Sequence, residues 1–309
     1  MNAIPPVSTN PRELLLVSGA SGALARQTIE QLLRHRPDAP LIAATRHPDQ
    51  LADLAARGVS VRFADFDRPA SLDAAFAGAS RMLLVSTNTT EGSARRIAQH
   101  RQAIEAAQRQ GLRHLAYTSF ATAGAAQPGP VAADHAATER LLRDSGLGVS
   151  ILRNAFYAEM LRMTLPLACA SGELPCAPGR GRMTWVARAD CAAAAAAALL
   201  DGFEGRRTCT VAGEESLDAH ALAALASEVL GVPIAAVETP PDQLAQAWAR
   251  CGASPGMAAL FAGIDGATAR GEMEIRGSDL RALLKALPGA EPTSLRAFLQ
   301  AHRAALRAV

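Results

Sequence analysis

The stretch from Glu13 to Leu33 decides the fold, and it reads ELLLVSGASGALARQTIEQLL. An apolar run is followed by a turn of small residues and then by a segment with helical period. Gly19 and Gly22 occupy the first two positions of a G-x-x-G-x-x-G turn, and Ala25 occupies the third. The first glycine of such a turn makes the bend, the second admits a phosphate, and the third lets helix and strand pack closely. Alanine can serve that third purpose, so the stretch predicts a strand, a dinucleotide-binding turn and a helix.

The turn itself is the first candidate binding site. A helix start offers free N–H groups and the positive end of its dipole to a pyrophosphate, and the hydroxyl of Ser21 could add a donor. The alternative is a purely structural turn between strand and helix. Its position after the first strand, where it opens an amphipathic helix, favours binding. The expected contacts are Gly19, Ala20, Ser21, Gly22, Ala23 and Leu24.

Short apolar runs alternate with segments of helical length through the first half of the chain. This alternation predicts a parallel sheet covered by helices on both faces, which is an α/β, Rossmann-type, doubly wound fold. The runs lie at residues 14–18, 41–45, 59–65, 81–86, 114–119 and 149–154.

The alternation loosens after residue 154. Residues 172–182 are interpreted as a loop, and an alanine-rich helix at 190–200 is flanked by strand-like segments at 182–187 and 208–213. We therefore expect two parts, with a dinucleotide-binding Rossmann domain at 1–154. A smaller, interleaved α/β lobe on the substrate side is expected at 155–309, with about 182–213 returning to the Rossmann sheet.

The composition is that of an ordinary globular protein. The 309 residues are 49% hydrophobic and 19% charged, with a formal net charge of +2. No basic stripe with interleaved aromatic residues suggests a nucleic-acid partner. No run has the length of a membrane span or of a signal peptide, which favours a cytoplasmic location and no membrane partner. The five cysteines and seven histidines are scattered without ligand spacing, so neither disulfides nor a metal site is expected.

The second strand ends in Thr45, Arg46 and His47. An NAD-binding protein places an Asp or Glu at about this point to accept a hydrogen bond from the ribose 2′-hydroxyl. A cation suits a 2′-phosphate instead, so Arg46 favours NADPH over NADH. A solvated surface charge at the start of a loop is the alternative for Arg46.

The carboxyl ends of the next strands should supply further cofactor contacts, because open α/β sheets bind ligands at that edge. Residues after the third strand should meet the adenine, those after the fourth should pass near the ribose and pyrophosphate, and those after the fifth should approach the nicotinamide. Each is also a routine residue for a turn or a strand end. In chain order they are Asp65 and Phe66, then Ser86, Thr87 and Asn88, then Thr118 and Ser119.

With these residues in place, the sequence resembles the NmrA-like branch of the atypical short-chain dehydrogenases and reductases, and within it the NADPH-dependent quinone oxidoreductase 2 type. The likeness is carried by stretches from about residue 14 to 200, and weaker similarity reaches the C-terminus. Among them are VSGASGALA, RRIAQHRQAIEAAQRQGLRHLAYTS, ADHAATERLLRDSGLGVSILRNAFYAEM and VARADCAAAAAAAL.

The resemblance implies NADPH binding and two-electron reduction of quinone-like acceptors. It also implies that Val131 and His135 occupy the two positions of the family's Tyr-x-x-x-Lys motif. The residue inventory agrees, because neither Tyr117 nor Tyr157 has a lysine four residues later, and Lys285 is the single lysine. A relay of that kind is therefore excluded by the sequence.

A quinone tolerates the loss of a tyrosine acid, since its reduced product is a stabilised phenolate that can take a proton from solvent. The candidate catalytic donors are His135, Asn154 and Tyr157. His135 could also bond to the nicotinamide ribose and act as a local proton source, as its ordinary pKa class allows. Phe156 and Tyr157 could stack on a flat aromatic substrate, although an aromatic pair at a helix start is often part of a core.

Two other functions remain open. One is a redox sensor, an NmrA-like protein that binds NADP(H) and acts on a protein partner without turnover. The other keeps the enzyme class but changes the acceptor to an aromatic dye, an azo compound or an isoflavone-like substrate. The chain is expected to be a monomer or a homodimer.

Overall fold

The computed structural model describes residues 13–87, 93–126 and 130–307. Seven parallel strands form the main sheet, in the order β10-β6-β5-β4-β1-β2-β3. The predicted Rossmann-type α/β class is confirmed. The strands are β1 (Leu15–Ser18), β2 (Leu41–Thr45), β3 (Ser60–Phe63), β4 (Arg81–Leu84), β5 (His114–Phe120), β6 (Gly148–Asn154) and β10 (Arg206–Val211).

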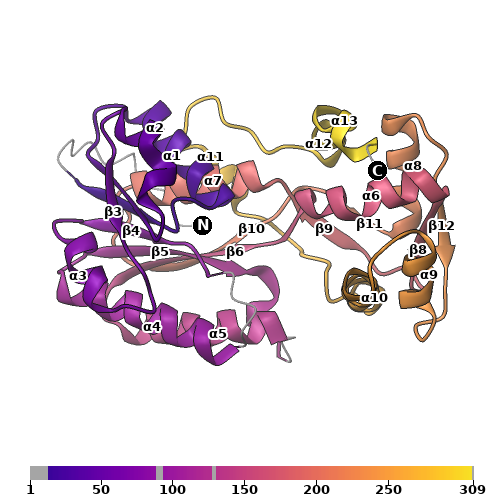
Figure 1. The fold of residues 1–309 in the computed structure, drawn as a ribbon, viewed down its shortest axis with the longest axis horizontal. Helices are drawn as coiled ribbons and strands as arrows, with labels where there is room; N and C mark the ends of the chain where they lie inside the picture. Colours follow the sequence, from indigo (N-terminus) through magenta and orange to yellow (C-terminus); the bar gives the residue numbers. More distant parts are fainter. Residues whose placement is uncertain (1–12, 88–92, 127–129, 308–309) are drawn as a thin grey trace. The chain divides into compact units, whose positions relative to one another are not determined.

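Helices cover both faces of this sheet (Figure 1). One face carries α1 (Ala23–His35), α2 (Ala52–Ala55), α7 (Arg188–Leu200) and α11 (Leu280–Leu284), and the other carries α3 (Ala70–Phe76), α4 (Ser93–Arg109) and α5 (Pro130–Asp144). Turns of 3-10 helix occur at Pro48–Leu51, Ala121–Gly124 and Ala158–Met160.

Spacing of apolar residues explains how these helices dock. In α1 the side chains of Leu24, Thr28, Ile29 and Leu32 are buried, which is one face of a helix with 3.6 residues per turn. In α7 every residue from 190 to 200 is buried, and its run of alanines lets the helix lie close to its neighbours. Fully burying a side chain such as Ile29 contributes about 1.5–3 kcal/mol.

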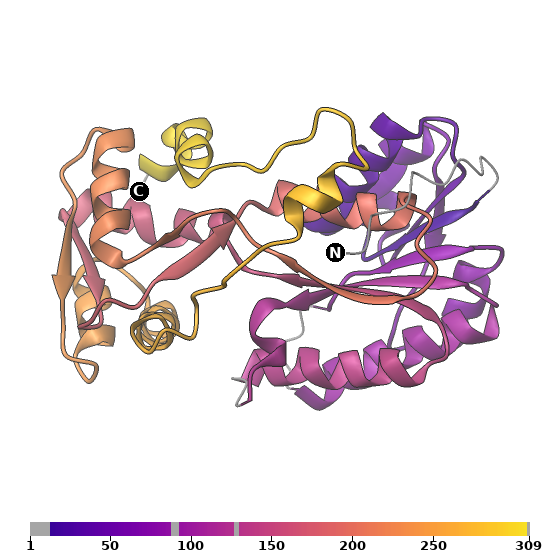
Figure 2. The ribbon, with the colours of Figure 1, turned by 180° about the vertical axis from the view of Figure 1, so that it is seen from behind.

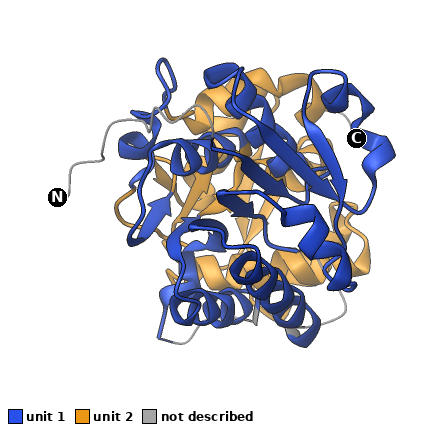
Figure 3. Cartoon of the chain, turned by 90° about the vertical axis from the view of Figure 1, so that its left-hand side faces the viewer, with its two compact units in different colours: residues 1–154, 189–211, 279–291 blue, residues 155–188, 212–278, 292–309 orange. Residues whose placement is uncertain are grey.

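The chain divides into two compact units, coloured in Figure 3. Unit 1 contains residues 1–154, 189–211 and 279–291, and unit 2 contains residues 155–188, 212–278 and 292–309. Within the segment 182–213, residues 189–211 belong to unit 1 and contain β10, which pairs with β6, whereas β9 pairs with strands of unit 2.

Unit 2 is the smaller unit and contains both helices and strands (Figure 2). It has its own hydrophobic core. A three-stranded sheet has the order β11-β9-β7, and β12 pairs with β8. Its strands are β7 (Phe156–Tyr157), β8 (Glu173–Cys176), β9 (Met183–Val186), β11 (Ser216–Leu217) and β12 (Ala235–Glu238). Its helices are α6 (Leu161–Ser171), α8 (Ala219–Leu230), α9 (Leu244–Arg250), α10 (Pro255–Ala269), α12 (Leu295–Ala301) and α13 (Arg303–Arg307).

Two expectations for this lobe are wrong. Residues 173–176, expected in a loop, form β8, because their backbone pairs in parallel with β12. Phe156 and Tyr157, expected at a helix start, form β7 beside β9, and a 3-10 turn at Ala158–Met160 separates them from α6. In the described residues, no helix combines the length and the apolar character that crossing a membrane requires.

Candidate functional site

The turn after β1 has the geometry of a phosphate-binding turn. Gly19 has a φ of 62°, in the left-handed region that favours glycine. The N–H of Gly22 donates to the Gly19 carbonyl at 2.8 Å, and a Cβ on Gly22 would lie 3.2 Å from the same oxygen. Helix α1 begins at Ala23 with no side-chain cap, so its first N–H groups stay available to an anion. Ala25 is fully buried, as expected for the third position of the turn.

The end of β2 lies beside this turn. Thr45 is buried, and its hydroxyl donates to the Ser21 hydroxyl at 3.1 Å. The next residue, Arg46, is exposed and forms no hydrogen bond or ion pair within the described part of the chain. The pKa of Asp67 lies below its usual value, chiefly because Arg95 donates to that carboxylate and to a smaller degree because Arg46 is near. Arg46 thus offers a free guanidinium next to the turn.

The side chains after β3 have structural partners. Asp65 accepts a hydrogen bond from the backbone N–H of Asp67 at 3.0 Å, which closes a tight turn. Phe66 is partly buried against the core of unit 1. The N–H of Asp65 donates to the Ser71 hydroxyl at 3.0 Å, which stabilises the same turn. Both predicted adenine contacts therefore also stabilise the loop that follows β3.

Side chains from neighbouring elements fix the backbone after β4. The N–H of Val85 donates to the Ser18 hydroxyl at 3.0 Å, and the N–H of Ser86 donates to the Thr118 hydroxyl at 2.8 Å. Thr118 and Ser86 are thus brought together at the carboxyl edge of the sheet. Asn88, the other residue predicted in this segment, lies outside the described residues.

His100 holds the next residue of the same segment. Its Nε2 accepts a hydrogen bond from the Thr87 N–H at 3.0 Å, and its Nδ1 lies 2.8 Å from the Thr138 hydroxyl. Burial lowers the pKa of His100 to about 3, so the imidazole is neutral at neutral pH. His100 therefore positions the β4 segment, a contact that sequence reasoning missed because 13 residues separate His100 from Thr87.

His135 is buried beneath β5 and bonded to a tyrosine. Its Nδ1 lies 2.8 Å from the phenolic oxygen of Tyr117, and Phe120 lies near the same ring. Burial lowers the pKa of His135 to about 4 and raises the pKa of Tyr117. Both groups are therefore neutral at pH 7, and among the described residues Nε2 of His135 has no hydrogen-bond partner.

Ser119, a predicted cofactor contact, has a structural partner. It is buried, and its hydroxyl donates to Glu139 at 2.7 Å. Arg153 binds both oxygens of Glu139, at 3.0 and 2.7 Å. A Cβ on Gly124 would lie 2.4 Å from the Arg153 guanidinium, so any larger residue there would displace this guanidinium. Glu139 of α5 thus links β5, through Ser119, to β6, through Arg153.

Three predicted residues follow one another where the chain leaves the main sheet. Asn154 is buried and ends β6, in register with Val211 of β10. In unit 2 the ring of Phe156 lies edge-on to Trp185, with centroids 5.5 Å apart. The Arg188 guanidinium stands over the Tyr157 ring at 5.3 Å from its centroid, a distance at which a cation and an aromatic ring attract.

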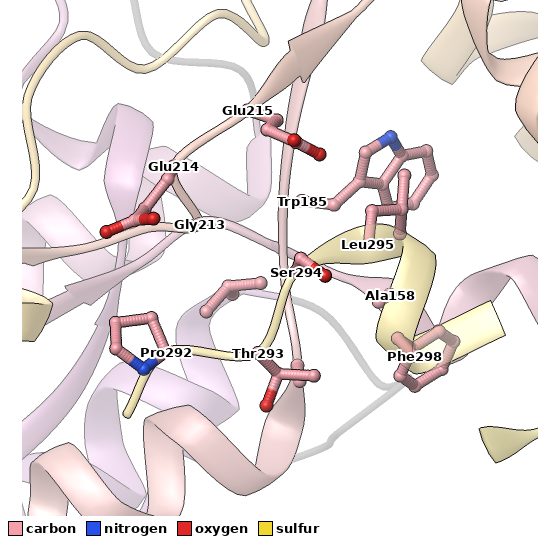
Figure 4. A pocket seen from close by; sticks show the side chains of 12 residues that line it. Ala158, Trp185, Gly213, Glu214, Glu215, Pro292, Thr293, Ser294, Leu295 and Phe298 are labelled. Carbon is pink, nitrogen blue, oxygen red and sulfur yellow. The ribbon is translucent and has the colours of Figure 1, made fainter. Parts of the chain in front are cut away.

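Unit 2 also holds a small pocket of about 420 Å³ (Figure 4). Backbone and side chains of the β9–β11 region and of the segment before α12 line it. Labelled residues include Trp185, Glu214, Glu215, Ser294 and Phe298. Within the described ranges no group of three or more potential metal ligands occurs, so this pocket and the sheet edge hold no metal-ligand set.

A parallel sheet with a glycine turn at its first strand, and with polar side chains gathered at its carboxyl edge, defines a Rossmann-type dinucleotide-binding protein. The chain belongs to the NAD(P)H-binding family, whose model matches residues 19–202. The resemblance found in the sequence is thereby confirmed, and the chain is an NAD(P)H-dependent oxidoreductase.

Three comparisons agree with this assignment. The chain is 31% identical over 258 residues to quinone oxidoreductase 2 of Escherichia coli, covering 84% of this chain and 89% of the relative. It resembles the crystal structure of Citrobacter sp. triphenylmethane reductase with NADP(H), at a TM-score of 0.84 and 29% identity, covering 93% of this chain and 99% of that one. For the E. coli NADPH-dependent quinone oxidoreductase with NADPH, the TM-score is 0.82 and the identity 32%, with coverage of 93% and 99%.

Proposed function

We propose that the chain transfers a hydride from NADPH to a quinone-like aromatic acceptor without a Tyr-x-x-x-Lys relay. The observation that carries the proposal is the 31% identity to E. coli quinone oxidoreductase 2 across most of both chains. The similar crystal structures contain NADP(H) or NADPH, and one of them is of a triphenylmethane reductase. An aromatic acceptor is what these relatives have in common.

NADPH is proposed over NADH because of Arg46. Its exposed guanidinium follows β2 beside the glycine turn, and Thr45 and Ser21 link the two segments. A planar guanidinium can form two parallel hydrogen bonds with the 2′-phosphate of NADPH. NADH has a 2′-hydroxyl at this position, which is uncharged and cannot accept two such hydrogen bonds.

The proposed cofactor contacts are those of the carboxyl edge. The turn would hold the pyrophosphate through backbone N–H groups, and the segments after β3, β4 and β5 would follow the adenosine and the nicotinamide ribose. When bound, the reduced nicotinamide supplies the hydride. The proposed set is Gly19, Ala20, Ser21, Gly22, Ala23, Leu24, Arg46, Asp65, Phe66, Ser86, Thr87, Asn88, Thr118, Ser119 and His135.

The proton chemistry differs from the expectation that His135 is a local proton source. A group whose pKa is about 4 carries no spare proton at neutral pH. We propose that neutral His135 instead donates a hydrogen bond from Nε2 to the nicotinamide ribose. The reduced quinone, a stabilised phenolate, would take its proton from water.

Asn154 and Tyr157 complete the proposed catalytic donors, and Phe156 with Tyr157 would bind the acceptor. Arg188 over the Tyr157 ring gives that side chain a fixed neighbour. Donors of this kind stabilise the negative charge that develops on a quinone oxygen as hydride arrives.

NADPH oxidation by the full chain tests the proposal. Acceptors are 1,4-benzoquinone and 1,4-naphthoquinone, with acetophenone as the ketone control. We expect rapid turnover with both quinones and none with the ketone, whose alkoxide product needs an acid. Tight NADP(H) binding without turnover of any acceptor would favour the redox-sensor function instead, and rapid ketone reduction would contradict the proposed mechanism.

A further inference from the structure

Unit 2 contains a larger pocket of about 640 Å³, between the strands β7, β8 and β9 and the helices α6, α8, α9 and α10. Four aromatic side chains line it: Phe156, Trp185, Trp248 and Phe261. Trp248 and Phe261 meet edge to face with centroids 5.0 Å apart, so they already form a rigid aromatic wall.

Two carboxylates, those of Asp218 and Asp265, line this pocket, and only Asp218 has partners for both of its oxygens. Asp218 caps α8 by accepting from the Ala221 N–H at 2.8 Å, and Arg180 lies 3.8 Å from its other oxygen. Asp265 accepts from the indole N–H of Trp248 at 2.7 Å and has no other hydrogen-bond partner among the described residues. One oxygen of Asp265 thus remains available to an occupant.

The charges around Asp265 decide which occupant fits. No arginine, lysine or histidine lines the pocket along its described walls. Burial raises the pKa of the Asp265 carboxyl to about 7. The Cys176 thiol nearby also has a pKa raised by burial, to about 11, so it stays neutral. Above about pH 7, where Asp265 is ionised, an occupant that donates a hydrogen bond or carries a positive charge is favoured, and no cationic side chain among the described lining residues attracts an anion.

We propose that this pocket binds a planar aromatic molecule of about two fused rings that carries a hydroxyl or amino group. The donor group bonds to Asp265, and the rings pack against Trp248, Phe261, Phe156 and Trp185. All of these residues lie in unit 2. Phe156 is also a proposed acceptor contact, but Trp185, Trp248, Phe261 and Asp265 have no part in the proposed function, and the binding measured below needs no NADPH.

Tryptophan fluorescence can report binding at this site, because Trp185 and Trp248 are the two tryptophans of the chain and both line the pocket. At about pH 8.5, where Asp265 is ionised, the full chain without cofactor is titrated with 2-naphthol, 2-(aminomethyl)naphthalene or 2-naphthoate. Binding is followed by tryptophan fluorescence and by calorimetry. We expect saturable binding of the first two probes. The affinity for 2-naphthoate should be at least about tenfold lower, a difference of about 1.4 kcal/mol.

Variants test the role of the carboxyl. Asp265→Asn should lower the affinity for 2-(aminomethyl)naphthalene about tenfold and the affinity for 2-naphthol by less. The reason is that an amide oxygen still accepts a hydrogen bond but carries no charge. Asp242→Asn, an exposed aspartate in unit 2, is the matched control and should change neither affinity. Thr164→Phe places a ring in the pocket and should abolish binding of both probes while the thermal unfolding temperature stays close to that of the wild type.

Several results would overturn the proposal. They are the absence of saturable binding by either probe, equal affinity for 2-naphthoate, or unchanged binding in Thr164→Phe. Should Asp265→Asn fail to fold, the probe series and Thr164→Phe decide. Failure of quinone turnover leaves these outcomes unaffected, because no NADPH is present.

Discussion

The phenolic oxygen of Tyr117 lies 2.8 Å from Nδ1 of His135, and both side chains are buried. Burial raises the pKa of Tyr117 and lowers the pKa of His135 to about 4, so a neutral phenol meets a neutral imidazole. In the proposed arrangement, in which Nε2 donates to the nicotinamide ribose, Nδ1 carries no proton and accepts a hydrogen bond from the phenol. Tyr117 is therefore a positioning residue that selects the tautomer of His135.

Tyr117→Phe should loosen this arrangement. Without the donor, the ring of His135 can rotate and change tautomer, and a buried acceptor is left unsatisfied, which costs about 1–3 kcal/mol. We expect kcat for quinone reduction to fall about tenfold and the NADPH dissociation constant to rise, while the KM for the quinone stays unchanged. Steady-state kinetics and calorimetric titration with NADPH measure these quantities.

Ser145→Ala is the control for that variant, because its hydroxyl bonds to the Leu142 carbonyl at 2.7 Å just beyond the far end of the same helix. It should lower stability by about 0.5–1.5 kcal/mol and leave the kinetics unchanged. Equal kinetic effects of the two substitutions would show that Tyr117 contributes to stability alone.

Arg46→Ala should separate the two nicotinamide cofactors. Loss of the guanidinium removes a charge-assisted contact to a 2′-phosphate, so the dissociation constant for NADPH should rise about 10–100-fold while that for NADH changes little. Fluorescence titration with each cofactor measures both constants. Arg101→Ala, which removes an exposed arginine of α4, should affect neither. Equal losses for NADPH and NADH would refute the 2′-phosphate contact.

Gly19→Ala should weaken cofactor binding through the backbone. A φ of 62° costs an alanine about 1–2 kcal/mol, although its Cβ would meet only Val85 at an ordinary 3.8 Å. The turn is therefore expected to relax and to move its N–H groups. Gly58→Ala makes a matched control, since its φ is 85° and a Cβ there meets nothing within 4 Å. Both variants should lose similar stability in urea unfolding, but only Gly19→Ala should bind NADPH more weakly.

Three buried histidines predict how stability depends on pH. Burial lowers the pKa to about 3 for His100 and His114 and to about 4 for His135. Below about pH 6.5 the unfolded chain takes up protons that the folded chain refuses. The free energy of unfolding should therefore be constant above about pH 7. It should fall as pH drops toward about 4, by at most about 1.4 kcal/mol per pH unit for each histidine. Asp265, whose pKa burial raises to about 7, acts in the opposite direction over the same range and offsets about one of the three histidines.

Urea unfolding between about pH 8 and pH 4.5 measures this slope. His100→Asn should make it shallower, because one of the three groups is gone. His220→Asn, at an exposed position of α8, should leave the slope as it is in the wild type. A slope unaltered by His100→Asn would mean that other groups control the acid sensitivity.

The main sheet could be predicted from the sequence, because its strands are buried apolar runs separated by amphipathic helices. Each of the first six predicted runs overlaps an observed strand to within about two residues at either end, as element boundaries usually allow. Strand β8 could not be predicted, since ELPC contains a proline and follows a glycine, which is typical of a loop. Its pairing with β12 joins segments that are some 60 residues apart.

The candidate site shows the same limit. Residues at the ends of strands could be selected, because parallel strands end at one edge of a sheet. The sequence could not predict which side chains meet there. Tyr117 contacts His135 and Ser119 contacts Glu139 because alternate residues of β5 face α5. Their separations of 18 and 20 residues follow no helix or strand period.

The central claim is direct hydride transfer from NADPH to a quinone, and a single-turnover experiment tests it most directly. The full chain loaded with NADPH is mixed with excess 1,4-naphthoquinone, and the loss of NADPH absorbance is compared with that of NADPH deuterated at C4 on the transferred face. We predict complete oxidation in one phase that is slower for the deuterated cofactor. Bound NADPH that persists unoxidised, or oxidation that requires an added mediator, would contradict the claim.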